Sequence, residues 1–275
     1  MASINFYLTI DEIADYLAEK GINLPVACKR RDAKEPGRAI KERWEDRLYK
    51  LMRRYLRGQR KRLSLHLADR LAIRTMTVKA TAGEIESSIP TSVWRDDGMD
   101  ALLLILFSEA LQDGVELAGD GLGVGIEWAD VNTDAATFAR NYVTDWLLAL
   151  DEVTRNSLRE AIATFIDTPG FTIGDVMDML PFDDARALRI AVTEITRVFG
   201  RAELLAGLRL QELYPDLSVV KTWFTNNDDL VCAICGPLNG VRIPISDNFQ
   251  SVVGEIECPP AHVNCRCWMS TRTVI

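Results

Sequence analysis

The end of the chain carries the sequence feature that most restricts its fold. Five of the six cysteines and one of the two histidines lie between positions 232 and 267. They form an early pair, Cys232-Ala-Ile-Cys235, and a later group, His262-Val-Asn-Cys265-Arg-Cys267. Short pairs of soft donors at this spacing are typical of tetrahedral zinc sites. We therefore expect a small zinc-bearing lobe at 219–270.

The candidate ligands outnumber the four positions of such a site. They are Cys232, Cys235, His262, Cys265 and Cys267. On an extended strand Cys267 points to the same side as Cys265, so it can replace Cys265 or His262. Cys258 is expected to be a spectator. Four protein ligands leave no open position for water, which predicts a structural Zn²⁺ rather than a catalytic one.

Two enzyme classes that use these residue types do not fit the pattern. Zinc deaminases have His-x-Glu before Pro-Cys-x-x-Cys, whereas here the cysteine pair comes first and Val263 and Asn264 stand where an acidic shuttle is needed. A cysteine protease needs a histidine free to activate the thiol, and His66 is the only other histidine. We expect no enzymatic activity.

Composition and charge restrict the partners. No apolar run approaches the roughly 20 residues of a membrane span, and no secretory signal is evident, so we expect a soluble chain that is intracellular at synthesis and makes no membrane contact. The net charge is −8, but positions 29–79 hold 18 Lys and Arg against 6 Asp and Glu. That segment carries +12 and the rest −20. The basic segment either binds an acidic partner or is attracted to the acidic remainder of its own chain.

The basic segment has the pattern of one long amphipathic helix from about 37 to 73, with a potential break at Gly58. Such a helix can bind DNA phosphates, an acidic protein groove, or nothing beyond its own core. The candidate contacts for a polyanion or a protein partner are Arg53, Arg54, Arg57, Arg60, Lys61 and Arg62. A DNA-binding accessory protein is the alternative function that this segment suggests.

The remaining pattern predicts a mainly α chain with a small C-terminal α+β zinc lobe. We expect an N-terminal helical region at 1–80, a linker at 81–98 and a second region at 99–275. Further helices are expected at about 9–18, 99–118, 133–149, 151–167, 172–179 and 183–212, and strands at 219–224 and 240–245. The glycine-rich stretch 119–125 lacks the context of a phosphate-binding loop, so it is expected to be a flexible connector.

Three segments occur in a fixed order in the second half of the chain. The first is a helical segment with Arg186, Ala187, Ile190, Ala191, Thr193 and Glu194. The second contains Lys221, Trp223, Asp229, Cys232, Cys235 and Gly240. The third is Pro259-Pro260-Ala-His262-Val-Asn264-Cys265-Arg266-Cys267. Together they resemble the phage head-morphogenesis family typified by the F protein of phage Mu, over roughly 99–270.

The resemblance implies a non-enzymatic minor head protein of a tailed phage or prophage. Such a protein lies in the capsid interior near the portal and is incorporated during assembly in the host cytoplasm. The implied partners are portal, major capsid or scaffolding proteins, with packaged DNA as a further candidate. Structural roles are expected for Arg186, Thr193, Glu194, Trp223 and Asp229, with the first three anchoring the long helix to the zinc lobe.

Overall fold

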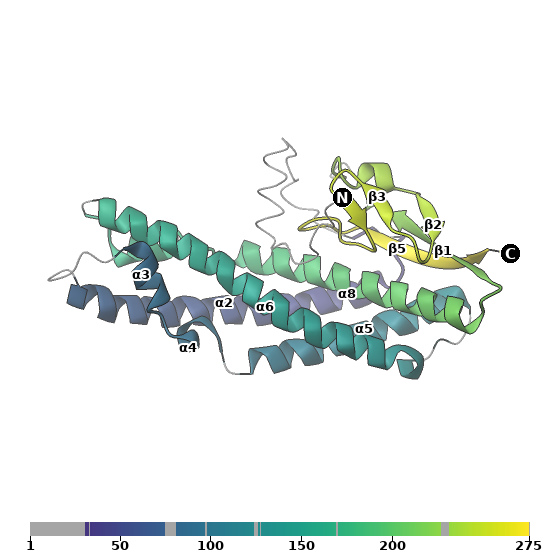
Figure 1. Cartoon of the computed structure of the whole chain (residues 1–275), viewed down its shortest axis with the longest axis horizontal. Helices are drawn as coiled ribbons and strands as arrows, with labels where there is room; N and C mark the ends of the chain where they lie inside the picture. The colour runs from purple at the N-terminus through teal and green to yellow at the C-terminus, as the bar shows by residue number, and fades with distance from the viewer. Residues whose placement is uncertain are drawn as a thin grey trace.

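Long helices lie side by side along the molecule, and a small strand-bearing lobe rests on one of them (Figure 1). This computed structural model describes residues 31–274 except 33, 75–80, 97, 124–125, 127, 169 and 227–230. The four long helices are α2 (Arg38–Arg74), α5 (Met99–Leu122), α6 (Trp128–Asp167) and α8 (Asp184–Leu213). The expected fold class, mainly α with a small C-terminal lobe that contains strands, is confirmed. The helix expected at about 9–18 lies outside the described residues.

α2 confirms the long basic helix of the sequence, and it continues through Gly58 without a break. Its apolar stripe, which includes Trp44, Leu48, Tyr55 and Leu63, is buried in the same hydrophobic core as α5, α6 and α8. α2 is therefore part of the helical body. The division into regions at 1–80 and 99–275 stays a prediction.

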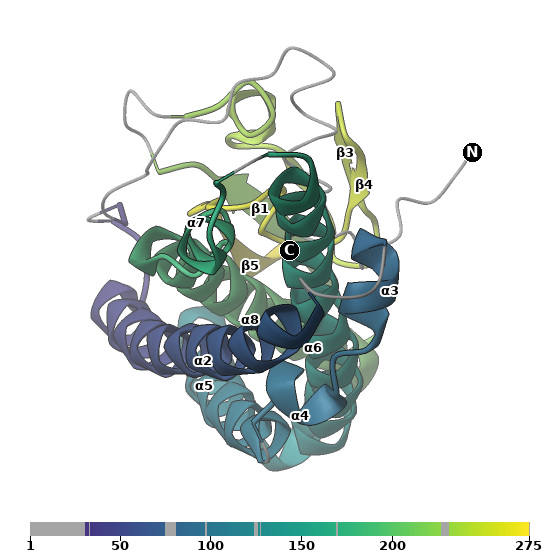
Figure 2. The same ribbon diagram turned by 90° about the vertical axis from the view of Figure 1, so that its left-hand side faces the viewer.

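The segment 81–98 is more structured than a linker. It forms α3 (Ala82–Ser87), which packs on α6, and α4 (Thr91–Trp94), which packs on α2 (Figure 2). A capping box between Thr81 and Glu84 starts α3. Ile85 and Trp94 are buried, and this burial stabilises short helices that the glycine and proline content of the segment disfavours.

Two expected helices, 133–149 and 151–167, are in fact the single helix α6. No glycine or proline interrupts Trp128–Asp167, and Leu150 and Asp151 at the expected break are both buried. The expected connector at 119–125 is shorter than predicted, because α5 continues to Leu122 and ends where Gly123 adopts a left-handed conformation with φ of 68°.

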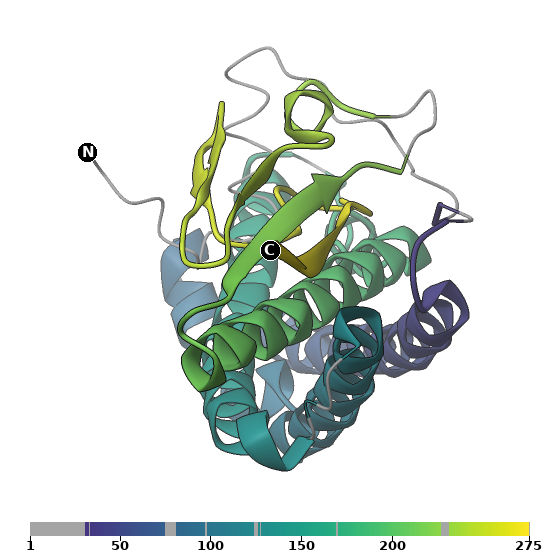
Figure 3. The same ribbon diagram turned by 90° about the vertical axis from the view of Figure 1, so that its right-hand side faces the viewer.

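The last two helices begin where the sequence places them. α7 (Ile173–Asp178) starts with a capping box between Thr172 and Asp175. The carboxylate of Asp183 accepts a hydrogen bond from the backbone N–H of Arg186 at 2.6 Å and caps α8. α8 contacts α2, α5 and α6 on its sides and the strands β1 and β5 above, so it lies between the helical body and the lobe (Figure 3).

The lobe contains two small antiparallel sheets. β1 (Ser218–Phe224) pairs with β2 (Arg242–Pro244) on one side and with β5 (Trp268–Val274) on the other, while β3 (Phe249–Ser251) and β4 (Gly254–Ile256) form a hairpin. The strands expected at 219–224 and 240–245 correspond to β1 and β2. β5 was not predicted, and the expected lobe limit at residue 270 cuts through it.

Candidate metal centre

The first pair of donors lies on a tight turn that the chain forms around its own sulfur atom. The backbone N–H of Cys235 donates to Cys232 Sγ at 3.4 Å, and the N–H of Gly236 donates to the carbonyl of Cys232 at 2.9 Å. The short 3₁₀ helix η1 (Gly236–Leu238) follows directly. Both sulfur atoms therefore face the same point, as a metal knuckle requires.

The second group lies on the segment that leads into β5. The backbone N–H of Cys265 donates to the carbonyl of His262 at 3.2 Å, and Asn264 between them has a φ of 60°. Asparagine is one of the few residue types other than glycine that adopts this left-handed conformation readily. The turn places His262 and Cys265 opposite the knuckle.

The donors converge in two overlapping groups. The first group consists of Cys232, Cys235 and His262. The second group consists of Cys235, Cys265 and Cys267. Within each group, all donor atoms lie within 4.8 Å of one another. His262 Nε2 lies 3.0 Å from Cys232 Sγ and 3.2 Å from Cys235 Sγ. The sulfur atoms of Cys235 and Cys265 are 3.8 Å apart. The five residues named as candidate ligands are thus brought together.

This donor set fits zinc. The sulfur separation matches the ~3.8 Å expected between two thiolates at tetrahedral angles with Zn–S bonds of ~2.3 Å. All five donors are buried, so an ion would be enclosed by protein. Cys235 belongs to both groups, while Cys265 and Cys267 both belong to the second. Cys258 belongs to neither group.

The imidazole of His262 is oriented for metal binding through Nε2. Its Nδ1 lies 2.7 Å from the carbonyl oxygen of Val263, so Nδ1 carries the proton and donates to that oxygen. A backbone carbonyl in this role fixes the ring and its tautomer in many metal sites.

Mutual contacts shift the ionisation of the cluster. A hydrogen bond from the Cys235 thiol, reinforced by His262, lowers the pKa of Cys232 to about 4. Burial by itself would lower the pKa of His262, but the negative charge on Cys265 and Cys232 raises it to about 9. By contrast, burial and the neighbouring Glu257 raise the pKa of Cys258 to about 11. Although burial opposes the shift, hydrogen bonds from Cys235 and Cys267 lower the pKa of Cys265, whereas the pKa values of Cys235 and Cys267 are raised by their contacts with Cys232 and Cys265. Thiolate, the form that binds a metal, is therefore favoured at Cys232 and Cys265.

One face of α8 supports the lobe that carries the candidate ligands, along most of the helix. Thr193 Oγ1 accepts a hydrogen bond from the backbone N–H of Asn264 at 2.8 Å. Two turns along, Gly200 lies so close to the loop that a Cβ atom there would be 2.5 Å from the carbonyl oxygen of Pro259. Glu203 accepts from the N–H of Thr271 at 2.7 Å, and Gln211 Oε1 accepts from the N–H of Val219 at 3.0 Å.

The other family-motif residues have structural roles, but not all of them touch the lobe. Arg186 donates to Thr154 Oγ1 and to the carbonyls of Leu150 and Pro181, which joins α8 to α6 and to the α7–α8 connection. Glu194 accepts a hydrogen bond from the hydroxyl of Tyr142 on α6 and pairs with Arg197. Of the three residues expected to anchor α8 to the lobe, Thr193 does so, whereas Arg186 and Glu194 fasten α8 to the helical body.

The remaining two motif residues are Trp223 and Asp229. Trp223 is fully buried and makes an edge-to-face contact with Phe249, with ring centroids 5.2 Å apart. Asp229 lies outside the described residues.

The basic side chains of α2 pair largely with the chain's own acidic residues. Arg53 and Arg57 contact Asp184, Arg60 contacts Asp178, and Arg62 contacts Asp96. Arg54 and Lys61 are exposed. These pairs lie at or near the surface, where each stabilises the fold by at most ~1 kcal/mol. Their arrangement supports attraction between the basic helix and the acidic body, one of the two interpretations left open by the sequence.

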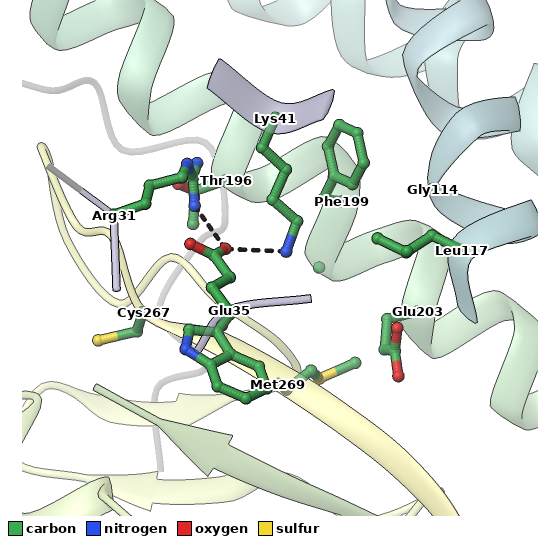
Figure 4. Close-up of a pocket in the computed structure, with 12 residues that line it drawn as sticks. Arg31, Glu35, Lys41, Gly114, Leu117, Thr196, Phe199, Glu203, Cys267 and Met269 are labelled. Atoms are coloured by element: carbon green, nitrogen blue, oxygen red, sulfur yellow. Dashed lines mark hydrogen bonds and ion pairs between the residues drawn. The ribbon is translucent and has the colours of Figure 1, made fainter. Parts of the chain in front are cut away.

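A buried ionic cluster that no sequence pattern indicates lies at the start of α2 and in the segment just before it. Glu35 Oε1 accepts from Arg31 Nη1 at 2.7 Å and from Lys41 Nζ at 2.8 Å (Figure 4). Arg31 also contacts Glu45 at 2.9 Å and donates to Thr196 on α8 at 2.9 Å. In the sequence these residues are indistinguishable from the surrounding charge run, and only the fold shows that they are buried.

Across the described parts of residues 31–274, no helix is both long and apolar enough to cross a membrane.

Comparison with known proteins identifies one match. Residues 139–270 match the family described as "Phage Mu protein F like protein". The matched region runs from within α6 to within β5, and so includes α7, α8 and the whole cysteine cluster. No curated protein and no solved structure matches the chain.

Proposed function

We propose that this chain, whose residues 139–270 are phage Mu F-like, is a non-enzymatic minor head protein of a tailed phage or prophage. It enters the head during assembly and acts near the portal, with a zinc ion as the structural centre of its lobe. The observation that carries the proposal is the family match, since it covers both the cysteine cluster and the helix that supports it.

The environment of the buried acidic residues supports a structural role. Asp151 is held by Arg95 at 2.6 Å, and Glu86 is held by Arg155 at 2.6 Å and Arg159 at 3.0 Å. Each of these pairs joins two separate helical segments. A carboxylate engaged in this way stabilises packing between helices and is poorly placed to act as a general acid or base.

The donor set supports a structural metal rather than a catalytic one. Cys235, His262 and two further thiols complete a tetrahedral sphere from protein alone, so no position is left for an activated water. The lobe has only short strands, and a bound ion would supply a centre that its apolar residues provide only in part.

The exposed helical faces are the proposed contact surface for portal, capsid or scaffolding protein. On the adjacent helices α5 and α6, Leu102, Ile105 and Leu148 are each at least half exposed, at 50%, 56% and 53%. Leu102 and Ile105 are three positions apart and so lie on one face of α5, and exposed apolar side chains grouped in this way are a common feature of protein contact sites. The lobe would then position these helices without itself making the contact.

Reconstitution of heads tests the proposal. The chain is co-produced with the portal, scaffolding and major capsid proteins of its phage, and heads are isolated by sedimentation. We expect the chain to sediment with the heads and to resist protease added from outside. A chain that stays at the top of the gradient, or that is digested as fast as the free protein, would rule out a place inside the head.

A matched pair of variants separates the contact surface from the metal. Leu102→Ser with Ile105→Ser is expected to reduce incorporation while the bound zinc is unchanged. Leu188→Ser, at a side chain of similar exposure on α8, serves as the control. Equal incorporation of both variants would exclude the α5 face as the contact.

A further inference from the structure

A small cavity lies where five parts of the fold meet. It is bounded by the segment before α2, the start of α2, the helices α5 and α8, and the beginning of β5, and its volume is about 10 Å³. Figure 4 shows Arg31 and Lys41 on either side of the Glu35 carboxylate at this junction. The cavity lies apart from the metal cluster, although Cys267 contributes to its wall.

One wall of the cavity carries the carboxylate of Glu35, of which only one oxygen has hydrogen-bond partners. Glu35 Oε1 accepts hydrogen bonds from both Arg31 and Lys41. Its second oxygen, Oε2, is shielded from solvent and has no hydrogen-bond partner among the described residues. The side chain of Glu35 is 0% exposed, so bulk water does not reach this oxygen.

A buried hydrogen-bond donor that also lacks a partner lies on another wall. The indole Nε1 of Trp268, the first residue of β5, is buried and has no partner within the described part of the chain. Glu35 and Trp268 line the same cavity. A buried acceptor and a buried donor that do not reach each other are both unfavourable, unless a small molecule joins them.

The cavity size restricts that molecule. Roughly 10–15 Å³ is the space that a single water needs, so larger ligands are excluded. A metal cation is disfavoured because Arg31 and Lys41 already neutralise Glu35. An anion is disfavoured by the carboxylates of Glu35 and Glu203, both of which line the cavity.

We infer that one buried water molecule binds here, donating a hydrogen bond to Glu35 Oε2 and accepting one from the indole N–H of Trp268. Thr196 and Glu203 are further polar residues of the cavity wall. Two to four polar partners are typical of a conserved internal water.

This water connects parts of the chain that are far apart in sequence. Glu35 belongs to the segment before α2, whereas Trp268 directly follows the candidate ligand Cys267. The site therefore joins the start of the helical body to the metal-bearing strand. The inference does not depend on the proposed head function, because it rests on the junction alone.

A crystal structure of the full zinc-loaded chain, at a resolution that shows ordered water, tests the site directly. We expect a single density peak within hydrogen-bond distance of both Glu35 Oε2 and Trp268 Nε1. A cavity without density would overturn the inference. So would a peak with several oxygen contacts near ~2.4 Å, because such contacts indicate a cation.

A double-mutant cycle provides an independent test in solution. Trp268→Phe keeps an aromatic ring but removes the donor, and Glu35→Gln keeps the shape but changes the acceptor. Since both side chains contact the same water, the loss of thermal stability in the double variant is expected to be smaller than the sum of the two single losses. Additive losses would overturn the inference, provided that all variants bind zinc normally.

Discussion

Thr193 in the middle of α8 accepts a hydrogen bond from the backbone N–H of Asn264, which lies between the candidate ligands His262 and Cys265. The same hydroxyl donates to the carbonyl of Arg189 at 2.7 Å, which fixes its direction. The helix thus holds the turn in the shape that presents both ligands. A single side chain connects the helical body to the geometry of the metal centre.

Replacing Thr193 by Val is expected to weaken both the fold and the metal site. Valine has nearly the same shape but cannot accept the hydrogen bond, so the N–H of Asn264 would lose its partner at a cost of ~1–3 kcal/mol. Chemical denaturation and competition with a zinc chelator measure the two effects. Thr144→Val, on an exposed face of α6, is the matched control. Unchanged chelator resistance in T193V would show that the bond does not shape the site.

Substituting the cysteines one at a time is expected to identify the ligands. Cys235→Ser should abolish stoichiometric zinc, because Cys235 belongs to both donor groups. Cys265→Ser should bind zinc more weakly than Cys267→Ser, since Cys265 has the 3.8 Å separation from Cys235 that suits two ligands. The metal content of each variant measures the zinc stoichiometry, and the absorption spectrum of its cobalt-substituted form reports the number of thiolate ligands. Cys258→Ser is the control, and loss of metal there would contradict the proposed ligand set.

Adding one methyl group at Gly200 is expected to displace the lobe. The new Cβ would lie 2.5 Å from the carbonyl oxygen of Pro259, a backbone atom that cannot rotate away. We expect Gly200→Ala to cost ~1–3 kcal/mol by overpacking. Gly121→Ala is the matched control, because Gly121 is also helical but has no atom within 4 Å of the added methyl. There, alanine should stabilise the helix by up to ~1 kcal/mol. Similar effects at both positions would refute the close approach at Gly200.

Glu203 is expected to make the stability of the fold depend on pH. Burial raises its pKa above the ordinary value of 4.5, although Thr271 and Lys41 oppose the shift. The protonated form is therefore favoured in the folded chain, and stability present below about pH 4.5 is lost as the pH rises through the folded pKa.

Denaturation of a Glu203→Gln variant tests this direction. Glutamine keeps an acceptor for Thr271 but carries no charge, so its stability relative to the unaltered chain should increase from about pH 5 to about pH 8. Glu212→Gln, at an exposed carboxylate on the same helix, is the control. A gain for E203Q that is constant, or that decreases with pH, would show that Glu203 is stabilised as a carboxylate.

The ion pairs of α2 predict weak binding to DNA. Because Arg53, Arg57, Arg60 and Arg62 already contact acidic residues, few cations remain for phosphates. We expect binding to duplex DNA to be undetectable at about 0.15 M salt, and Asp184→Asn to increase it at low salt. Tight binding with a steep salt dependence, reduced by Arg54→Glu and Lys61→Glu, would instead support the DNA-binding alternative.

The sequence was most informative where local rules act. The capping residues Thr172, Asp175 and Asp183 mark the starts of α7 and α8, and the absence of proline marks the long helix α2. The close approach of the cysteine and histidine donors followed from their spacing. Other features depend on contacts between distant segments. Trp94 is buried against α6 by an arrangement that no local pattern specifies, and Arg186 and Thr193 look alike in sequence but fasten α8 to different neighbours.

The contacts between α8 and the lobe extend along the helix from Thr193 to Gln211. A force that pulls the lobe parallel to this helix would load these contacts together, as shear, whereas a force perpendicular to it would open them one after another, as peeling. The molecule is therefore mechanically anisotropic. It will resist displacement of the lobe along α8 much more strongly than lifting of the lobe away from it.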